Sequence, residues 1–214
     1  MSVSPSSVSD AGAPLLAARA LACRRGERLL FEGLELELRA GQVLWLRGAN
    51  GRGKTSLLRL LAGLARPAGG ELERPAAGFV YIAHANALKD DLSALENVQF
   101  LARLHGDAAD AATCTEALRR FGLATRRHAP VRTLSQGQRR RVALARLALA
   151  TGRTLWLLDE PYDALDAEGC ATLDRLLSEH ARGGGAVVLT SHLPLALSEP
   201  VPTVLQLDAV PALQ

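Results

Sequence analysis

The chain has few cysteines, and their placement suggests neither a disulfide framework nor a zinc site. Cys23, Cys114 and Cys170 are odd in number, lie far apart and form no CxxC pair. Disulfide-rich secreted domains and structural zinc sites both depend on cysteines at short, regular spacings. The pattern therefore fits a protein of the reducing cytosol best.

The sequence also lacks any run of about 18 residues that is both apolar and free of charge, the length that a membrane-spanning helix needs. We expect no span in this chain, so that work at a membrane would require a partner that supplies one. Residues 1–13 are small and polar, without the basic start and apolar centre of a signal peptide. We interpret them as a disordered N-terminal tail.

A strong excess of one charge and an internal repeat are both missing. The formal net charge of +3 permits contact with an anionic membrane surface or with nucleic acid but argues for neither. Because 48% of the 214 residues are hydrophobic, the composition is that of a folded protein with room for one α/β domain and a small inserted subdomain. Without a repeat, we expect no second copy of this domain in tandem.

The most informative segment that is present is GANGRGKT, at residues 48–55. It fits the phosphate-binding loop pattern, in which two glycines separated by four residues precede Lys and a hydroxyl residue. An apolar strand precedes it and a helix follows it, so backbone amides and the positive helix end can hold phosphates. Lys54 can reach the β- and γ-phosphates, and Thr55 can ligate Mg²⁺. The predicted nucleotide-binding residues are Gly48, Ala49, Asn50, Gly51, Arg52, Gly53, Lys54, Thr55 and Ser56.

A second apolar strand, at residues 155–158, ends in the carboxylates Asp159 and Glu160. The carboxyl ends of strands form the rim at which α/β folds bind ligands. We predict that Asp159 holds Mg²⁺ through its hydration shell and that Glu160 orients and deprotonates an attacking water. A strand that simply ends in a charged turn is the alternative, and the phosphate-binding loop favours the functional interpretation.

Strands and helices alternate along the chain, which implies a largely parallel sheet covered by helices. We predict an antiparallel edge sheet near residues 15–22 and 33–38. From residue 88 to about 121 the pattern is helical, with a capping box at Ser93 and Glu96 that opens one helix. This helical block is a candidate inserted subdomain.

The segment LSQGQ, at residues 134–138, precedes a helix predicted over residues 136–150. Ser135 and Gln138 form a capping box at its start. Capping does not account for Gly137, because glycine in a first turn lowers helix stability. A helix N-terminus without a Cβ, next to a serine hydroxyl, suits a second contact with phosphate.

With this segment the sequence resembles the ABC ATPase superfamily, whose signature loop it matches except at Gln136, where glycine is commonest. Ala164, Leu165 and Asp166 match the D-loop of that superfamily, and Ser191 with His192 matches its switch histidine. The resemblance implies an α/β P-loop fold with a mostly parallel core sheet, an antiparallel β edge sheet and an inserted α-helical subdomain. We predict the nucleotide-binding core at 14–87 and 134–214, and the helical subdomain at about 88–133.

The resemblance further implies that ATP lies between two copies of the domain. In that superfamily the signature loop faces the phosphate-binding loop of a second ATPase domain, and His192 would contact the γ-phosphate as a catalytic residue beside Glu160. The residues implied to bind the partner's nucleotide are Ser135, Gln136, Gly137, Gln138 and Asp166. ATP would close the dimer, and hydrolysis would open it.

Two further positions depart from the pattern of the superfamily. Ala85 stands where a glutamine that contacts Mg²⁺ is expected, so either His84 or Asn86 substitutes for it or the metal has one protein contact fewer. The aromatic residue that usually stacks on adenine aligns near Arg24 and Arg25. Either a guanidinium, that of Arg25, stacks on the base or the pair is solvated, and both interpretations stay open.

A basic cluster follows the signature segment, and its composition alone could indicate nucleic-acid binding. The cluster lies on the predicted helix over residues 136–150, whose apolar positions face the core, so we expect its arginines to point mostly outward. A solvated or interface face is the more economical interpretation. The residues concerned are Arg139, Arg140, Arg141 and Arg146.

Further runs resemble the ATP-binding subunits of bacterial cytochrome c maturation systems, often called haem exporter ATPases. They lie at residues 81–89, 91–97, 155–162 and 184–192. This resemblance implies an ATPase with ATP and Mg²⁺ as cofactors, acting as a homodimer on the cytoplasmic face of the bacterial inner membrane. Integral-membrane permease subunits would be its partners, and hydrolysis would drive release of haem-loaded chaperone or haem export. We expect no direct contact with haem or nucleic acid.

Two other functions remain as alternatives. The first is an ABC ATPase subunit for another transported substrate, because such a domain rarely contacts the cargo. The second is a soluble ABC ATPase that acts on ribosomes or DNA. Proteins of that kind usually carry two ATPase domains or a long coiled-coil insert, and this chain shows neither.

Overall fold

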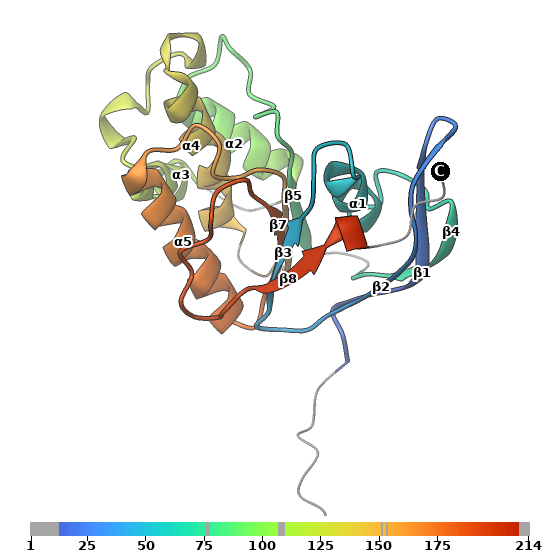
Figure 1. Ribbon diagram of the computed structural model, residues 1–214. Coiled ribbons are helices and arrows are strands. Elements are labelled where there is room, and N and C mark those ends of the chain that lie inside the picture. The colour runs from blue at the N-terminus through green and yellow to red at the C-terminus, as the bar shows by residue number, and fades with distance from the viewer. Residues whose placement is uncertain (1–12, 76–77, 107–109, 151, 153, 210–214) are drawn as a thin grey trace, which may run out of the picture.

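The computed structural model describes residues 13–75, 78–106, 110–150, 152 and 154–209 (Figure 1). Of the predicted tail at residues 1–13, all but the last residue lies outside this part of the chain. A central sheet separates a group of helices on one side from a single helix and a second sheet on the other (Figure 1). Among the described residues, no helix combines the length and the apolar character needed to cross a membrane.

The central sheet has five strands in the order β5-β6-β7-β3-β8, and each neighbouring pair is parallel. Its strands are β3 (Val43–Arg47), β5 (Phe79–Ile82), β6 (Leu155–Leu158), β7 (Ala186–Thr190) and β8 (Thr203–Gln206). Every residue of β6 and β7 is buried, as expected for strands covered on both faces. The predicted parallel core is therefore confirmed. The edge strand β8 is mostly exposed, so no apolar run in the sequence predicts it.

A three-stranded antiparallel sheet, in the order β2-β1-β4, lies beside the central one. Its strands are β1 (Leu16–Arg25), β2 (Arg28–Leu38) and β4 (Gly69–Glu73). Helix α1 (Lys54–Leu61) lies between the two sheets (Figure 1), and its leucines share one core with Phe31 and Leu46. This arrangement confirms the predicted edge sheet and supports the loop before α1 from both sides.

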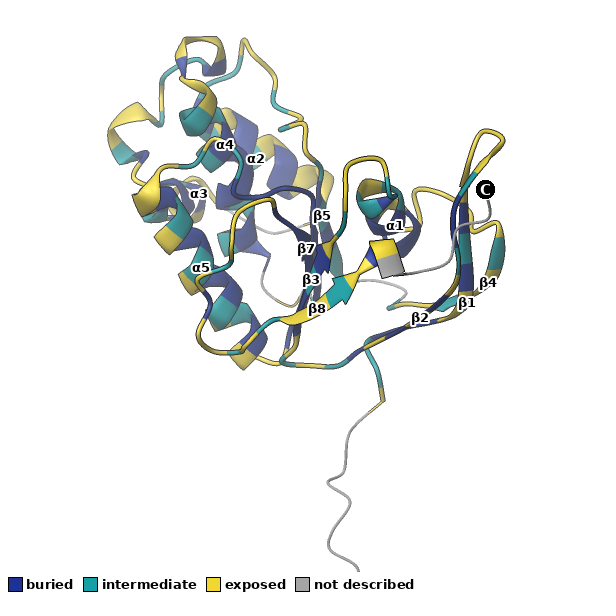
Figure 2. Cartoon of the chain, viewed as in Figure 1, coloured by how far each residue is buried: buried dark blue, intermediate teal, exposed yellow. Residues whose placement is uncertain are grey.

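The other face of the central sheet is covered by α2, α3, α4 and α5, whose buried sides face inward in Figure 2. These helices are α2 (Ala94–Leu104), α3 (Ala111–Arg120), α4 (Gln136–Ala145) and α5 (Ala167–Arg182), and the 3₁₀ turns are η1 (Ala124–Arg126), η2 (Val131–Thr133), η3 (Arg146–Leu149) and η4 (Leu207–Ala209). The capping box of Ser93 and Glu96 is present.

Two predicted helix boundaries differ from the structure. The helix predicted over residues 136–150 ends at Ala145, and a 3₁₀ turn, a frequent helix ending, continues the chain. The helical pattern expected from residue 88 begins only at Ala94. The amide nitrogen of buried Asn97 donates to the carbonyls of Lys89 and Leu92, which holds the preceding segment as a loop.

Candidate active site

The predicted phosphate-binding loop connects β3 to α1. Gly53 is the N-cap of α1 at φ 99°, in the left-handed region, and a Cβ there would lie 3.3 Å from side-chain atoms of Leu30 and Phe31. Glycine therefore suits the left-handed conformation, and a Cβ here would press on these two side chains. No side chain caps the first turn of α1, and that turn contains no acidic residue. Its free amides and the helix dipole together suit an anion.

The loop lines a pocket of about 210 Å³ together with residues from distant parts of the chain. Arg25, Glu160 and His192 all contribute to its walls, whereas Arg24 does not. The remaining lining residues are Leu30, Ala49, Asn50, Gly51, Gly53, Lys54, Thr55 and Ser56. The fold therefore places Glu160, His192, Arg25 and most of the predicted phosphate-binding residues around one space, whereas Gly48 and Arg52 do not line it.

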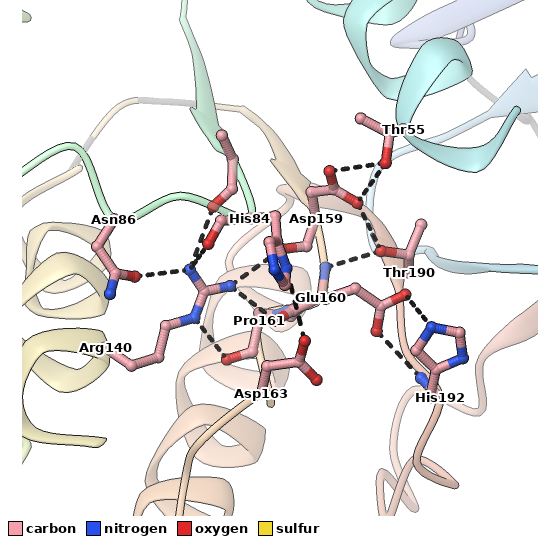
Figure 3. A network of polar contacts seen from close by, with 11 residues as sticks. Thr55, His84, Asn86, Arg140, Asp159, Glu160, Pro161, Asp163, Thr190 and His192 are labelled. Carbon is pink, nitrogen blue, oxygen red and sulfur yellow. Dashed lines mark hydrogen bonds and ion pairs between the residues drawn. The ribbon is translucent and has the colours of Figure 1, made fainter. Parts of the chain in front are cut away.

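Asp159 lies behind this pocket, at the end of β6, and is only 2% exposed. The hydroxyl of Thr55 donates to its Oδ2 at 2.9 Å, and the hydroxyl of Thr190 donates to its Oδ1 at 3.0 Å (Figure 3). The Thr190 hydroxyl also accepts from the Glu160 backbone N–H at 2.7 Å. No motif in the sequence marks Thr190, although it ends β7, the strand that precedes the switch histidine.

Glu160 is held with its carboxylate toward His192. Its Oε2 accepts from the His192 backbone N–H at 3.1 Å, and its Oε1 lies 3.5 Å from His192 Nε2 (Figure 3). The Glu160 side chain is 10% exposed, against 57% for His192. Glu160 has φ 47°, a left-handed conformation that costs a non-glycine residue on the order of 1–3 kcal/mol. Such conformations persist where the surroundings determine them, often at active sites.

The signature segment lies at a second pocket of about 370 Å³, which shares no lining residue with the first. Ser135, Gly137, Gln138 and Asp166 all line it, whereas Gln136, although exposed, does not. A Cβ on Gly137 would lie 2.7 Å from the Ala164 carbonyl oxygen. Close approach of α4 to the D-loop segment is therefore a further reason for glycine here.

The predicted capping box at Ser135 is confirmed, and Asp166 also caps a helix. Asp166 Oδ1 accepts from the Gly169 backbone N–H at 2.9 Å at the start of α5, and its carboxylate pairs with Arg141. The backbone hydrogen bond and Arg141 hold the pKa of Asp166 below its usual value. Asp166 is therefore charged at neutral pH and fixed beside Ser135 and Gly137.

The expectation that the signature-helix arginines point mostly outward is wrong for Arg140, which is 2% exposed. Its guanidinium donates to the backbone carbonyls of Asp159 (3.0 Å) and Glu160 (2.7 Å) and to Asn86 Oδ1 (3.0 Å; Figure 3). The carbonyls beyond the ends of β5 and β6 need donors, and a guanidinium has five N–H groups. Arg141 also turns inward, whereas Arg139 pairs with Asp90 at 3.0 Å.

Neither candidate substitute for the missing glutamine is recorded in contact with Asp159 or Thr55. His84 Nδ1 lies 3.5 Å from Asp163, and Asn86 accepts from Arg140 (Figure 3). Ala85 itself is exposed. Asn86 is thus tied to Arg140 rather than to the metal-site residues.

Asp208, near the end of the described chain, holds the outer side of the phosphate-binding loop. Its Oδ2 accepts from the Ala49 backbone N–H at 3.0 Å, and its Oδ1 lies 3.0 Å from Arg52 Nε. Gln206 donates to the same carboxylate at 2.9 Å. No motif in the sequence marks Asp208, because only the pairing of β8 with β3 brings it to the loop.

The strand–loop–helix arrangement, with its separate signature face, defines an ATP-binding cassette ATPase. The family model described as ABC transporter matches residues 31–163. The cytochrome c biogenesis ATP-binding export protein CcmA of Aromatoleum aromaticum is 50% identical over 210 residues, which cover 93% of this chain and 98% of that protein. The chain belongs to this family of ABC ATP-binding export proteins. Nucleotide binding and ATPase activity follow from that membership.

Solved structures agree with the fold. A putative ABC transporter ATP-binding protein from Pyrococcus furiosus aligns with a TM-score of 0.79 at 22% identity, covering 91% of this chain and 98% of that one. An ATP-binding cassette in a dimeric post-hydrolysis state, bound to ADP and Pi, aligns with a TM-score of 0.72 at 23% identity, covering 83% and 88%. At these identities the likeness concerns the fold alone.

Proposed function

We propose that the chain is the ATP-hydrolysing subunit of a membrane complex for cytochrome c maturation. The observation that carries the proposal is the pocket that joins the phosphate-binding loop to Glu160 and His192. The name of the relative from Aromatoleum aromaticum supports the choice of system. The nucleotide is ATP, held by its phosphates along residues 48–56.

Different side chains around the pocket bind different parts of the nucleotide. Lys54, whose Nζ lies 2.7 Å from the Gly48 carbonyl oxygen, provides the mobile positive charge for the β- and γ-phosphates. Arg25 and Leu30 also line the pocket, and the Arg25 guanidinium stacks on the adenine. The loop amides and α1 neutralise the remaining phosphate charge.

The oxygen atoms of Thr55 and Asp159 fit a magnesium ion, because hard oxygen donors meet there within 3.2 Å. The described residues contain no cluster of three His, Cys, Asp or Glu side chains for a metal. Mg²⁺ binds through one or two protein oxygens together with substrate phosphates and water. Bound there, with Asp159 contacting its hydration shell, Mg²⁺ would neutralise charge on the β- and γ-phosphates.

Glu160 acts as the general base for hydrolysis. The His192 backbone N–H fixes Oε2 of the carboxylate, and Oε1, which faces the His192 imidazole at 3.5 Å, accepts a proton from water once that imidazole turns to the γ-phosphate. The water oxygen attacks the γ-phosphorus, the bond to the ADP oxygen breaks, and the proton passes to Glu160. The exposed imidazole of His192 donates a hydrogen bond to the γ-phosphate, where it would be shielded from solvent by a second subunit.

A second copy of the chain completes each site. Ser135, Gly137, Gln138 and Asp166 surround a pocket separate from the phosphate-binding loop, so within one chain they have no nucleotide to contact. In a homodimer they, with exposed Gln136, would bind the γ-phosphate side of the partner's ATP. The dimeric state of the related cassette bound to ADP and Pi supports this arrangement.

Integral-membrane permease subunits are the proposed partners, with the ATPase dimer on the cytoplasmic face of the bacterial inner membrane. Closing and opening of the dimer would release haem-loaded chaperone or export haem. We propose that the chain itself contacts neither haem nor nucleic acid.

A deletion strain tests this function. We expect loss of c-type cytochromes, restored by the wild-type gene and by the surface control Asp91→Asn but not by Glu160→Gln. Normal c-type cytochromes in the deletion strain, with membrane subunits of another system co-purifying, would instead identify a different cargo. Salt-dependent affinity for RNA or DNA at physiological ionic strength would favour the ribosome or DNA alternative.

A further inference from the structure

We propose that Arg140 is a positioning residue that couples the two ATP sites of the dimer, an inference that rests on the proposed dimeric function. Arg140 lies on α4, whose N-terminal residue Gln136 follows Ser135 directly. The same short helix therefore carries the signature face at one end and this buried guanidinium further along. The guanidinium contacts the backbone of Asp159 and Glu160, at the end of β6, and the segment that follows β5.

The guanidinium joins three segments that are separate in the sequence. Nε donates to the Pro161 carbonyl at 3.3 Å. One terminal nitrogen donates to the Ala83 carbonyl at 3.1 Å, to the His84 carbonyl at 3.4 Å and to Asn86 Oδ1. The other terminal nitrogen donates to the carbonyls of Asp159 and Glu160 (Figure 3). Helix α4, the end of β6 and the segment after β5 are thus tied through one side chain.

All but one of these acceptors are backbone carbonyls, so Arg140 orients the active-site chain without touching the reacting atoms. The shortest bond, 2.7 Å, reaches the carbonyl of Glu160, whose φ of 47° needs support from its surroundings. The Thr190 hydroxyl holds the N–H of the same residue at 2.7 Å. Hydrogen bonds therefore fix both the N–H and the carbonyl of Glu160, the proposed general base. Arg140, from α4, provides the bond at the carbonyl.

This arrangement gives a physical route between the sites. A γ-phosphate bound by the partner subunit would draw Ser135 and Gly137 toward it, and α4 would move as a unit. A misplacement of about 1 Å at a reacting group can cost on the order of 100-fold in rate. A small shift of Arg140 therefore changes the position of the Glu160 carboxylate relative to the attacking water. ATP at one site thereby sets the hydrolysis rate at the other.

The planar fork of arginine is what this role requires. Lysine would keep the buried positive charge near Asp159, Glu160 and Asp163 but presents its donors from a single point. It cannot span the Pro161 carbonyl on one side and Ala83 on the other. Arg139 directly precedes Arg140 on α4. Its guanidinium contacts Asp90 and the Leu134 carbonyl and none of the strand ends, so Arg139 is a matched control.

The test measures ATP hydrolysis by the full chain with its co-purifying membrane subunits. For Arg140→Lys and Arg140→Gln we expect kcat to fall on the order of 10–100-fold, KM to change less than about threefold, and the Hill coefficient for ATP to fall from above 1 toward 1. Arg139→Lys and Arg139→Gln should leave kcat, KM and the Hill coefficient within about twofold. Circular dichroism confirms that each variant is folded.

Several outcomes would overturn the inference. They are an unchanged Hill coefficient in Arg140→Lys, a loss confined to KM, and equal effects of the Arg139 variants. If both Arg140 variants unfold, Asn86→Ala decides, because it removes one acceptor from a loop; unchanged cooperativity would then make Arg140 a folding residue only. A wild-type Hill coefficient of 1 would remove the coupling but leave the ATPase function intact, whereas an absence of hydrolysis in the wild type would remove the proposed function.

Discussion

The hydroxyl of Thr55 donates to the carboxylate of Asp159 at 2.9 Å, although 104 residues separate them in the chain. Thr55 lies in the first turn of α1, and Asp159 follows the last residue of β6. The parallel sheet brings these two ends to the same edge, where α/β folds bind their ligands. Each of the following predictions depends on that edge or on the packing behind it.

Replacement of Lys54 tests the phosphate assignment. Lys54→Ala removes a charge-assisted contact with the β- and γ-phosphates, and we expect the dissociation constant for ATP to rise by about 10–100-fold. Fluorescence titration with a labelled ATP analogue measures the change. Arg59→Ala, on the exposed side of the same helix, is the control. An unchanged dissociation constant in Lys54→Ala would contradict the assignment.

Replacement of Glu160 separates binding from hydrolysis. Glu160→Gln keeps the size of the side chain but cannot accept the proton, so we expect turnover to fall by roughly 100–10,000-fold. The variant should still bind ATP and should accumulate as a closed dimer, which size-exclusion chromatography with ATP detects. Hydrolysis at the wild-type rate would remove Glu160 as the general base.

A mixture of two inactive variants tests the composite site. Ser135→Arg blocks the signature face, and Lys54→Ala damages the phosphate-binding loop, so each homodimer has two defective sites. The heterodimer restores one intact site, built from Lys54 of one subunit and Ser135 of the other. We expect activity in the mixture above that of either variant alone. With heterodimers demonstrated by differential tags, no gain in activity would argue against sharing of the site.

Replacement of Asp208 tests the support of the loop from outside. Asp208→Asn weakens the ion pair with Arg52 and the hydrogen bond from the Ala49 N–H, both of which are partly exposed to solvent. We expect a rise of about two- to tenfold in the dissociation constant for ATP, with kcat unchanged at saturation. Asp91→Asn, which loses only an exposed pair with Arg132, should bind ATP normally. A lowered kcat with normal affinity would assign Asp208 a different role.

Acidification tests the packing of His180, which stacks on Trp156 with ring centroids 3.8 Å apart. Burial lowers the pKa of His180 from 6.5. Below that value the unfolded chain binds a proton that the folded chain does not, so stability falls as pH decreases from about 6.5 toward the folded-state pKa. We expect part of the drop in Tm between neutral and mildly acidic pH to vanish in His180→Phe. An identical pH dependence in both proteins would contradict this.

Local sequence patterns were sufficient for the parts of the fold that depend on neighbouring residues. The capping boxes at Ser93 and Ser135 form as predicted, because a capping box needs only residues three positions apart. The buried strands β6 and β7 are readable from their unbroken apolar runs. Edge strand β8 is not, because its exposed residues carry no such pattern.

The sequence alone determined the nucleotide class, since GANGRGKT encodes its conformation and its chemistry within eight contiguous residues. Only the tertiary structure decided that Arg140 is buried, that Asp208 supports the loop, and that Thr190 joins Asp159 to the Glu160 backbone. Those roles arise where strand ends far apart in the chain leave polar groups that need partners. Which side chain meets that need depends on packing in three dimensions, and no local pattern records it.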